Sequence, residues 1–405
     1  MRTLRRLFCA APLLLLAPAL AQPAPRPAVA GEGSEVQREV EQLFAAMSHA
    51  VLTRDVDGYL SLVAGGDREF LAEQRYFARD FAKPGKETKE LSITLDPATL
   101  EVGDGSAFAT VTYTWLQAKG EEGKDAKERT VSFPARFENE NGVWKYGGEK
   151  WHKHEAPGVL VLFDEGLDGA AAAAAEAFTS VRGGVERSFG LDATEFPRRT
   201  KTIKLYSGMK HLQQSICLSY VDGLSGWNEP GEPLKLLTGA GQTKSERFRS
   251  LLAHEYGHCA TFELGPKSND MPWWVLEGVA DQMTETVDDK ARDRAVKAAE
   301  RWSRAGTLAA WDDLADFEKV PDRLTGRVYT QGHAMMVYIS ETYTPAKRNA
   351  WMRAMSNGAS IDQASTDVLG VSFAELDRQW RASLPAKDVG DGQDKPGGEK
   401  PQEGT

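Results

Sequence analysis

Apolar residues near the start of the chain recur at helical spacing and then give way to strand-like alternation. Val36, Val40, Phe44, Met47 and Val51 lie three or four residues apart, which predicts an amphipathic helix. A second helix is predicted around residues 59–63. The inward positions of two alternating strands are Val111, Tyr113 and Trp115, and then Val131, Phe133, Ala135 and Phe137. Residues 121–124 have the composition of the hairpin turn between them, and residues 142–146 of a closing strand.

The pattern changes after Pro157. We expect a long alanine-rich helix at residues 167–189, because alanine has the highest helix propensity. Strands are predicted at 201–205, 217–221 and 234–237, and helices from residue 248 to residue 384. With a length of 405 residues, this pattern predicts two domains, 34–152 and 157–384, of an α+β protein. His152 and His154 are expected in the linker between them.

Both ends of the chain differ from these two regions. Arg2, Arg5 and Arg6 precede an apolar run from Leu7 to Leu20, and Ala19-Leu20-Ala21 has the form of a cleavage site. Residues 1–21 are therefore predicted to be a signal peptide of an exported protein, periplasmic or extracellular. Residues 22–33 and 385–405, rich in Pro, Gly and charged residues, are predicted to be disordered. We expect no membrane-spanning segment in the mature chain.

Charge narrows the choice of partners. The formal net charge is −10, and no cluster of Lys and Arg with interleaved aromatic residues is present. Proteins that bind nucleic acid need basic patches, so a nucleic-acid partner is not expected.

The most informative motif is His254-Glu255-Tyr256-Gly257-His258. Residues four apart on a helix share one face, so both imidazoles can bind one metal ion, and Glu255 can face a water molecule. Such H-E-x-x-H sequences are typical of zinc hydrolases. Eighteen residues separate His258 from Glu277, which lies within an otherwise apolar helix. His254, His258 and Glu277 would leave one tetrahedral position of Zn²⁺ open, as in catalytic zinc sites.

With this spacing, and with Glu277 in a Trp-x-x-Glu-Gly-x-Ala run, the sequence resembles the gluzincin peptidases of the peptidase MA-like type, which are related to M1 aminopeptidases and thermolysin. The resemblance covers about residues 157–383. It implies a small sheet followed by a mostly helical C-terminal lobe, one zinc ion per chain, and a peptide or protein substrate. Glu255 would be the general base.

Two further roles are implied by this resemblance. Tyr329-Thr330-Gln331-Gly332 resembles the Tyr-x-x-Gly helix of the M1 group, which implies that Tyr329 donates a hydrogen bond to the oxyanion. Asp281 lies four residues after Glu277, where thermolysin-like relatives have an Asp that orients the first metal-binding His. The Gly-x-Met-Glu-Asn strand of M1 aminopeptidases is absent, and Glu229 is interpreted as a turn residue. His333 is interpreted as a buried structural histidine.

The first region has a weaker resemblance. Helices followed by an antiparallel sheet that ends in Gly142-Val143-Trp144-Lys145 resemble the NTF2-like (SnoaL-like) fold, which implies a cone with an accessory or binding role. Aromatic residues such as Tyr59, Trp115 and Phe133 are expected in its core. The resemblance brings no catalytic motif.

Cleavage of the signal peptide would leave two cysteines, Cys217 and Cys259. An exported protein is permitted to join them in a disulfide, and two buried thiols are the equal alternative. For the whole chain we expect an exported zinc metallopeptidase. The alternatives are a zinc hydrolase of another amide or ester, and a binding protein that holds metal without turnover.

Overall fold

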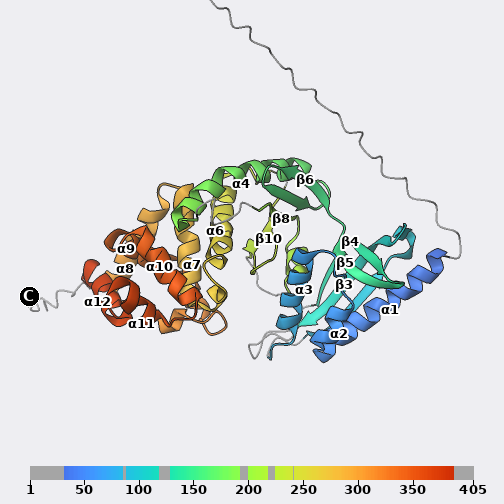
Figure 1. Cartoon of the computed structure of the whole chain (residues 1–405), viewed down its shortest axis with the longest axis horizontal. Coiled ribbons are helices and arrows are strands. Elements are labelled where there is room, and N and C mark those ends of the chain that lie inside the picture. The colour runs from blue at the N-terminus through green and yellow to red at the C-terminus, as the bar shows by residue number, and fades with distance from the viewer. Residues whose placement is uncertain are drawn as a thin grey trace, which may run out of the picture.

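The computed structural model describes residues 32–84, 88–117, 128–191, 199–217, 224–239 and 241–386. Figure 1 shows three regions in succession: a curled sheet with its helices, a second sheet beneath helix α4, and a group of helices at the C-terminal end. The protein is thus of mixed α and β structure, as the sequence predicts. The predicted signal peptide and residues 387–405 of the predicted tail lie outside the described residues.

The N-terminal region consists of three helices and a curled, half-barrel sheet. Its helices are α1 (Glu32–Thr53), α2 (Val56–Ser61) and α3 (Arg68–Phe81). Its strands are β1 (Thr88–Leu95), β2 (Glu101–Val102), β3 (Ser106–Gln117), β4 (Glu128–Glu140) and β5 (Val143–Glu149). The antiparallel order is β1-β3-β4-β5, with β2 paired to β3. Helix α1 begins within the lead-in predicted at 22–33, so residues 32 and 33 are helical instead.

Alternation along the strands fixes which face of this sheet is buried. Val111 and Trp115 of β3 are fully buried, and Phe137 of β4 packs edge-on against Phe44 of α1. On the other face, Thr112 hydrogen-bonds across the strands to Ser132 at 2.8 Å. The predicted inward positions are therefore confirmed, except that Val131 is only partly buried. The hairpin turn predicted at 121–124 lies outside the described residues.

Helix α3 has no counterpart in the predicted elements. Its N-cap is Asp67, whose carboxylate accepts hydrogen bonds from the backbone of Glu69 and Phe70. Two polar residues, Glu73 and Gln74, occupy buried positions among its apolar ones. They interrupt the apolar periodicity from which a helix is predicted.

The second sheet has the order β6-β7-β8-β10-β9. Its strands are β6 (His152–Ala156), β7 (Val159–Phe163), β8 (Lys201–Tyr206), β9 (Gly226–Trp227) and β10 (Leu234–Leu237). The three central strands are parallel, and the edge strands β6 and β9 are antiparallel to their neighbours. The predicted linker at His152 and His154 is therefore wrong, because β6 hydrogen-bonds along β7 there.

The strand predicted at residues 217–221 is also wrong at Cys217, which is the one residue of this strand that the structure describes. Helix α5 (Met209–Ser215) precedes Cys217, which has a φ of 60° and packs into the core of the N-terminal region. Residues 218–221 lie outside the described residues. A positive φ ends regular structure at a residue other than glycine, so the apolar run alone was misleading.

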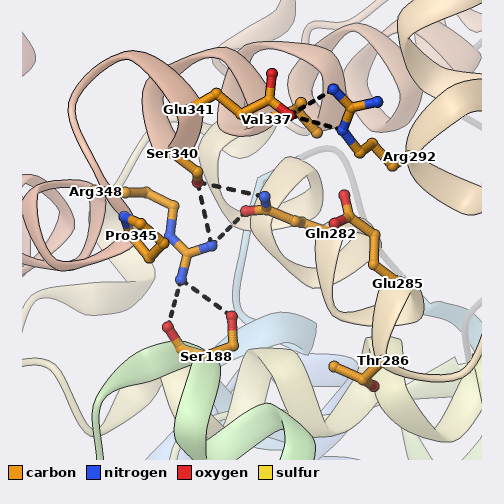
Figure 2. Close-up of a pocket in the computed structure, with 10 residues that line it drawn as sticks. All are labelled: Ser188, Gln282, Glu285, Thr286, Arg292, Val337, Ser340, Glu341, Pro345 and Arg348. Atoms are coloured by element: carbon orange, nitrogen blue, oxygen red, sulfur yellow. Dashed lines mark hydrogen bonds and ion pairs between the residues drawn. The ribbon is translucent and has the colours of Figure 1, made fainter. Parts of the chain in front are cut away.

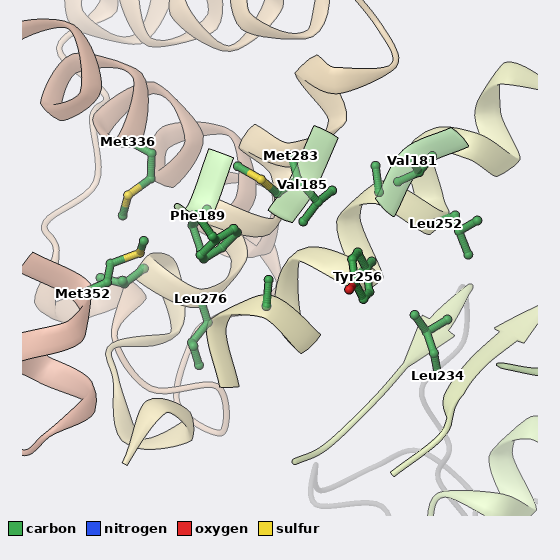
Figure 3. Close-up of a cluster of buried hydrophobic side chains, with 14 of the residues drawn as sticks. Val181, Val185, Phe189, Leu234, Leu252, Tyr256, Leu276, Met283, Met336 and Met352 are labelled. Carbon is green, nitrogen blue, oxygen red and sulfur yellow. The ribbon is translucent and has the colours of Figure 1, made fainter. Parts of the chain in front are cut away.

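Helices complete the structure, and one core joins them to the second sheet. They are α4 (Asp168–Phe189), α6 (Glu246–Phe262), α7 (Trp273–Met283), α8 (Ala291–Ala305), α9 (Thr325–Thr342), α10 (Pro345–Ser356), α11 (Ile361–Ala364) and α12 (Phe373–Ser383). Figure 3 shows Val185 of α4 near Met283 of α7, and Leu252 of α6 above Leu234 of β10. None of the described helices is long and apolar enough to cross a membrane.

A network of buried charges joins the N-terminal region to the second sheet. Lys204 of β8 lies 2.6 Å from Glu73 of α3 and 3.6 Å from Glu149 of β5. Lys235 of β10 lies 3.2 Å from both Glu73 and Glu232, and each of these side chains is at most 7% exposed. Buried charges are tolerated only when they are paired. The two regions are therefore held in one arrangement.

Candidate metal centre

Two helices bring the candidate ligands together. Helix α6 begins after Ser245, whose hydroxyl accepts from the backbone of Phe248, and it contains His254, Glu255 and His258. Helix α7 contains Glu277 and packs directly against α6. A Cβ atom at Gly257 would lie 3.0 Å from the backbone of Ala280, so a larger residue would push the two helices apart by a few tenths of an ångström.

A second close approach brings α9 to the same place. A Cβ atom at Gly278 of α7 would lie 2.5 Å from the carbonyl carbon of Gly332 in α9. Both glycines belong to the motifs on which the sequence resemblance rests. Their physical role is to let the helices that contain Glu277 and Tyr329 touch.

The three candidate ligand atoms form an almost equilateral triangle. His254 Nε2 and His258 Nε2 are 3.2 Å apart, and Glu277 Oε2 lies 3.3 Å from each of them. A tetrahedral zinc site with bonds of about 2.0–2.1 Å has edges of about 3.3–3.4 Å. Glu277 Oε2 is buried and faces the two imidazole nitrogens. Among the described residues, these three form the only group of this kind that could hold a metal ion. The donor set fits zinc with one position left open.

The charges at the triangle favour a cation. Burial lowers the pKa of His254, but hydrogen bonds to Asp281 and Glu277 raise it well above its usual range. Burial raises the pKa of Glu277, but the charge of His258 and hydrogen bonds from both imidazoles hold it well below its usual range. A positive charge placed among these atoms is therefore stabilised.

Neighbouring side chains orient the ligands. Asp281 Oδ1 lies 2.8 Å from His254 Nδ1, so the Nε2 atom of that ring is directed toward the triangle. This is the contact that the sequence resemblance implies for Asp281. Trp273 Nε1 donates to Glu277 Oε1 at 2.8 Å and leaves the other carboxylate oxygen for the metal. Trp273 was not among the predicted site residues, although its spacing of four residues from Glu277 on one helix indicates that the two side chains meet.

Glu255 lies beside the triangle and against strand β9. Its side chain is 6% exposed, and a Cβ atom at Gly226 would fall 2.2 Å from its Oε1 atom. Burial raises the pKa of Glu255, the two imidazoles lower it, and Glu277 and Asp281 raise it again. The net direction is upward, which makes this carboxylate a stronger base than an exposed one.

Tyr329 stands on the opposite side of the first histidine. Its ring lies 6.0 Å from the ring of His254 and 5.9 Å from that of Trp273. Burial, together with the charges of Glu277, Glu255 and Asp281, raises the pKa of Tyr329 far above its usual value. The phenol therefore stays protonated and keeps a proton to donate.

Other predicted residues lie outside the triangle. His333 Nε2 is 2.6 Å from Glu285 and is buried, so it is a structural histidine whose partner is a carboxylate rather than the backbone. Glu229 follows β9 in a turn and accepts a hydrogen bond from Asn269 at 2.6 Å. No disulfide joins the cysteines: Cys217 is in the N-terminal core, whereas Cys259 is on α6, where its Sγ accepts from Asn228. The two cysteines are therefore separate thiols, which is the alternative to a disulfide that the sequence leaves open.

Arg348 lines a separate polar pocket of about 310 Å³ (Figure 2). This arginine is 1% exposed, and its guanidinium donates to Gln282, Asn349 and the backbone carbonyl of Ser188. Burial lowers its pKa to about 10. Its donors are already used by neutral acceptors, so Arg348 ties α10 to α4 and α7 and offers no comparable site.

Comparisons with known proteins give no match. No family model matches this sequence, and no curated protein matches it significantly. The geometry of the site therefore carries the functional argument.

Proposed function

We propose that this protein is an exported, zinc-dependent metallopeptidase of the gluzincin type. The observation that carries the proposal is the triangle of His254, His258 and Glu277, whose edges of 3.2–3.3 Å fit one tetrahedral zinc ion. With three protein ligands, a fourth position stays open to water or substrate, as a catalytic rather than a structural site requires.

The residues around the triangle suit hydrolysis of an acyl bond. A zinc ion, when bound, supplies Lewis acidity and makes a water molecule more acidic. Glu255 would accept a proton from that water and return it to the leaving amine. Tyr329 keeps its proton and would donate a hydrogen bond to the oxygen on which negative charge develops. Asp281 and Trp273 hold the ligands in position.

The neighbouring strand favours a peptide over another amide or ester. Strand β9 is the last strand of its sheet, and no strand in the described part of the chain pairs with its outer edge. An extended chain that added to this edge would bring its backbone beside Glu255, which packs on Gly226. A small ester would make no use of such an edge.

The arrangement of the other parts agrees with this proposal. We infer that the curled sheet with its helices is an NTF2-like module, and that the second sheet and the C-terminal helices are the two lobes of a gluzincin domain. The basic and apolar pattern of residues 1–21 supports export.

Hydrolysis of a peptide library by the purified protein tests the proposal. We expect cleavage that is lost after treatment with a chelator and restored by zinc, and that is absent in Glu277→Ala. Glu176→Ala, which removes an exposed carboxylate of α4, is the control and should cleave normally. Cleavage that survives chelation, or a metal-loaded protein that cleaves no peptide in the library, would contradict the proposal.

A further inference from the structure

A hollow lies between the N-terminal region and helix α6. This cleft, of about 880 Å³, has residues of α3 such as Leu71 and Ala72 on one side, and Cys259 and Phe262 of α6 on the other. In Figure 1, α3 and α6 lie on the two sides of β10. One wall therefore belongs to the N-terminal region and the other to the helix that contains the metal ligands.

The cleft adjoins the candidate metal centre at one residue, and none of the three candidate ligands lines it. Phe262, which lines it, stacks on the ring of His258 with the ring centres 6.5 Å apart. The segment that follows β9 continues into the cleft, because Glu229 and Gly231 also line it. An extended chain that ran along β9 past Glu255 would therefore continue into this space.

Cationic side chains without carboxylate partners line the cleft. Arg68, Arg75 and Arg199 are exposed and form no hydrogen bond or ion pair through their guanidinium groups within the described part of the chain. Lys201 Nζ donates to the backbone carbonyl of Glu232 at 3.1 Å and contacts the thiol of Cys259, so it too has no carboxylate partner.

The acidic residues of the cleft offset these charges only in part. Glu232 is paired with Lys235, and burial and the charge of Glu232 raise the pKa of Glu229 to about 7, so that Glu229 is partly neutral at neutral pH. Glu263, which is exposed, and Glu69, which is half-buried, remain as carboxylates of the cleft. The excess is positive, although the whole chain has a net charge of −10. A local excess of this sign attracts anionic groups.

The wall that α3 forms is fixed in place. Besides the buried pairs of Glu73 with Lys204 and Lys235, Arg79 lies 3.6 Å from Glu229, and Lys83 lies 3.5 Å from Glu318. Glu318 follows Phe317, whose ring packs on Trp273 beside the metal ligands. Arg79 of α3 and Lys83, which follows this helix, thus connect the wall to two segments near the candidate site.

We propose that this cleft binds an acidic segment of the substrate polypeptide, with Arg68, Arg75 and Arg199 contacting its carboxylates. The N-terminal region is then one wall of the substrate site. This inference rests on the proposed peptidase function and names a class of substrate for it.

Binding to the full-length protein with Glu255→Gln tests this inference without any need for turnover. The probes are a fluorescent peptide rich in glutamate and its twin with glutamine at those positions. We expect the acidic peptide to bind about tenfold more tightly than its twin, and the difference to shrink as salt is added. Arg75→Glu, and likewise Arg68→Glu or Arg199→Glu, should raise the dissociation constant about fivefold, because each exposed ionic contact is individually weak.

Arg353→Glu is the matched control, because Arg353 is an exposed arginine of α10 that does not line the cleft. It should bind the acidic peptide as the parent does. Equal affinity for the two peptides, or unchanged affinity in all three cleft variants, would overturn the inference; thermal melts, and Arg75→Gln beside Arg75→Glu, separate loss of binding from loss of folding. Absence of hydrolysis by the wild-type protein would refute the peptidase and leave this binding result readable.

Discussion

Two of the buried polar clusters in the described part of the chain differ in how their polar atoms are arranged. At the interface of the N-terminal region with the second sheet, Lys204 and Lys235 each lie within ion-pair distance of two carboxylates. At the candidate metal centre, two imidazole nitrogens and Glu277 Oε2 converge, 3.2–3.3 Å from one another. Charges that pair with one another hold structure together, whereas two imidazoles and a carboxylate that converge suit the binding of a metal cation. The two clusters should therefore respond in opposite ways to substitution.

The largest effect is expected from Glu255→Gln. Glutamine keeps the shape of the side chain but cannot accept the proton, so kcat should fall by about 10³-fold or more. Zinc content and unfolding temperature should stay close to those of the wild type. Kinetics on a cleaved peptide, with metal analysis beside them, check this. Turnover that remained near the wild-type rate would remove Glu255 from the role of base.

A substitution in the interface cluster should lower the stability of the protein rather than its catalytic rate. Lys235→Met leaves Glu73 and Glu232 buried with less compensation, and should lower the free energy of unfolding by about 3–5 kcal/mol. The control is Lys150→Met, which breaks an exposed pair with Glu101 and should cost at most about 1 kcal/mol. Denaturant titration measures both. Equal stability of the two variants would mean that the buried network contributes nothing specific.

Alkaline pH should weaken the same interface. Burial lowers the pKa of His211, but hydrogen bonds and charges from Asp164 and Glu149 raise it to about 9, above the unfolded value. Its stabilising contribution, on the order of 3 kcal/mol, is therefore complete below about pH 6.5 and is lost as the pH rises through about 9. Denaturant unfolding between these limits measures the loss. His211→Gln should flatten the profile, and an unchanged slope in this variant would assign the effect to another group.

A smaller effect on catalysis is expected at Tyr329. Tyr329→Phe removes one hydrogen-bond donor to the oxyanion and should lower kcat about a hundredfold, with little change in KM. Steady-state kinetics separate the two constants. A change confined to KM would reassign Tyr329 to substrate binding.

The smallest effect concerns the cysteines. Because Cys217 and Cys259 lie in different cores and form no disulfide with each other, a reducing agent should leave the unfolding temperature unchanged. Alkylation of the unfolded, unreduced mature protein should label both thiols. A mass without the labels would show that a disulfide forms.

The sequence predicts one of these clusters far better than the other. Helix geometry already places His254 and His258 on one face, and Glu277, which packing of α7 on α6 brings to them, stands at a spacing typical of the resembled family. The interface charges come from distant segments: Glu73 and Lys204 are 131 residues apart and meet only in the folded chain. Helix α3 was not predicted, because the buried Glu73 interrupts the apolar periodicity from which a helix is predicted.

The difference between local pattern and contacts of distant segments also explains which other predictions from the sequence were right and which were wrong. Alternation placed Val111 and Trp115 correctly, because each strand has one buried face. The apolar run at Cys217 was misleading, since its positive φ depends on packing against a remote core. Gly257 was missed as a determinant of the site, because its close approach to Ala280 becomes evident only once α6 and α7 are placed together. Trp273 was missed although its spacing of four residues from Glu277 on one helix indicates their contact.

Zinc content of the purified, metal-replete protein tests the central claim most directly. Mass spectrometry under native conditions should find about one zinc ion per wild-type chain, the number that one tetrahedral site holds. The ion should be lost in Glu277→Ala and retained in Glu255→Gln, since only the first substitution removes a ligand. A folded wild-type chain without bound metal, or full zinc occupancy in Glu277→Ala, would contradict the proposed three-ligand centre.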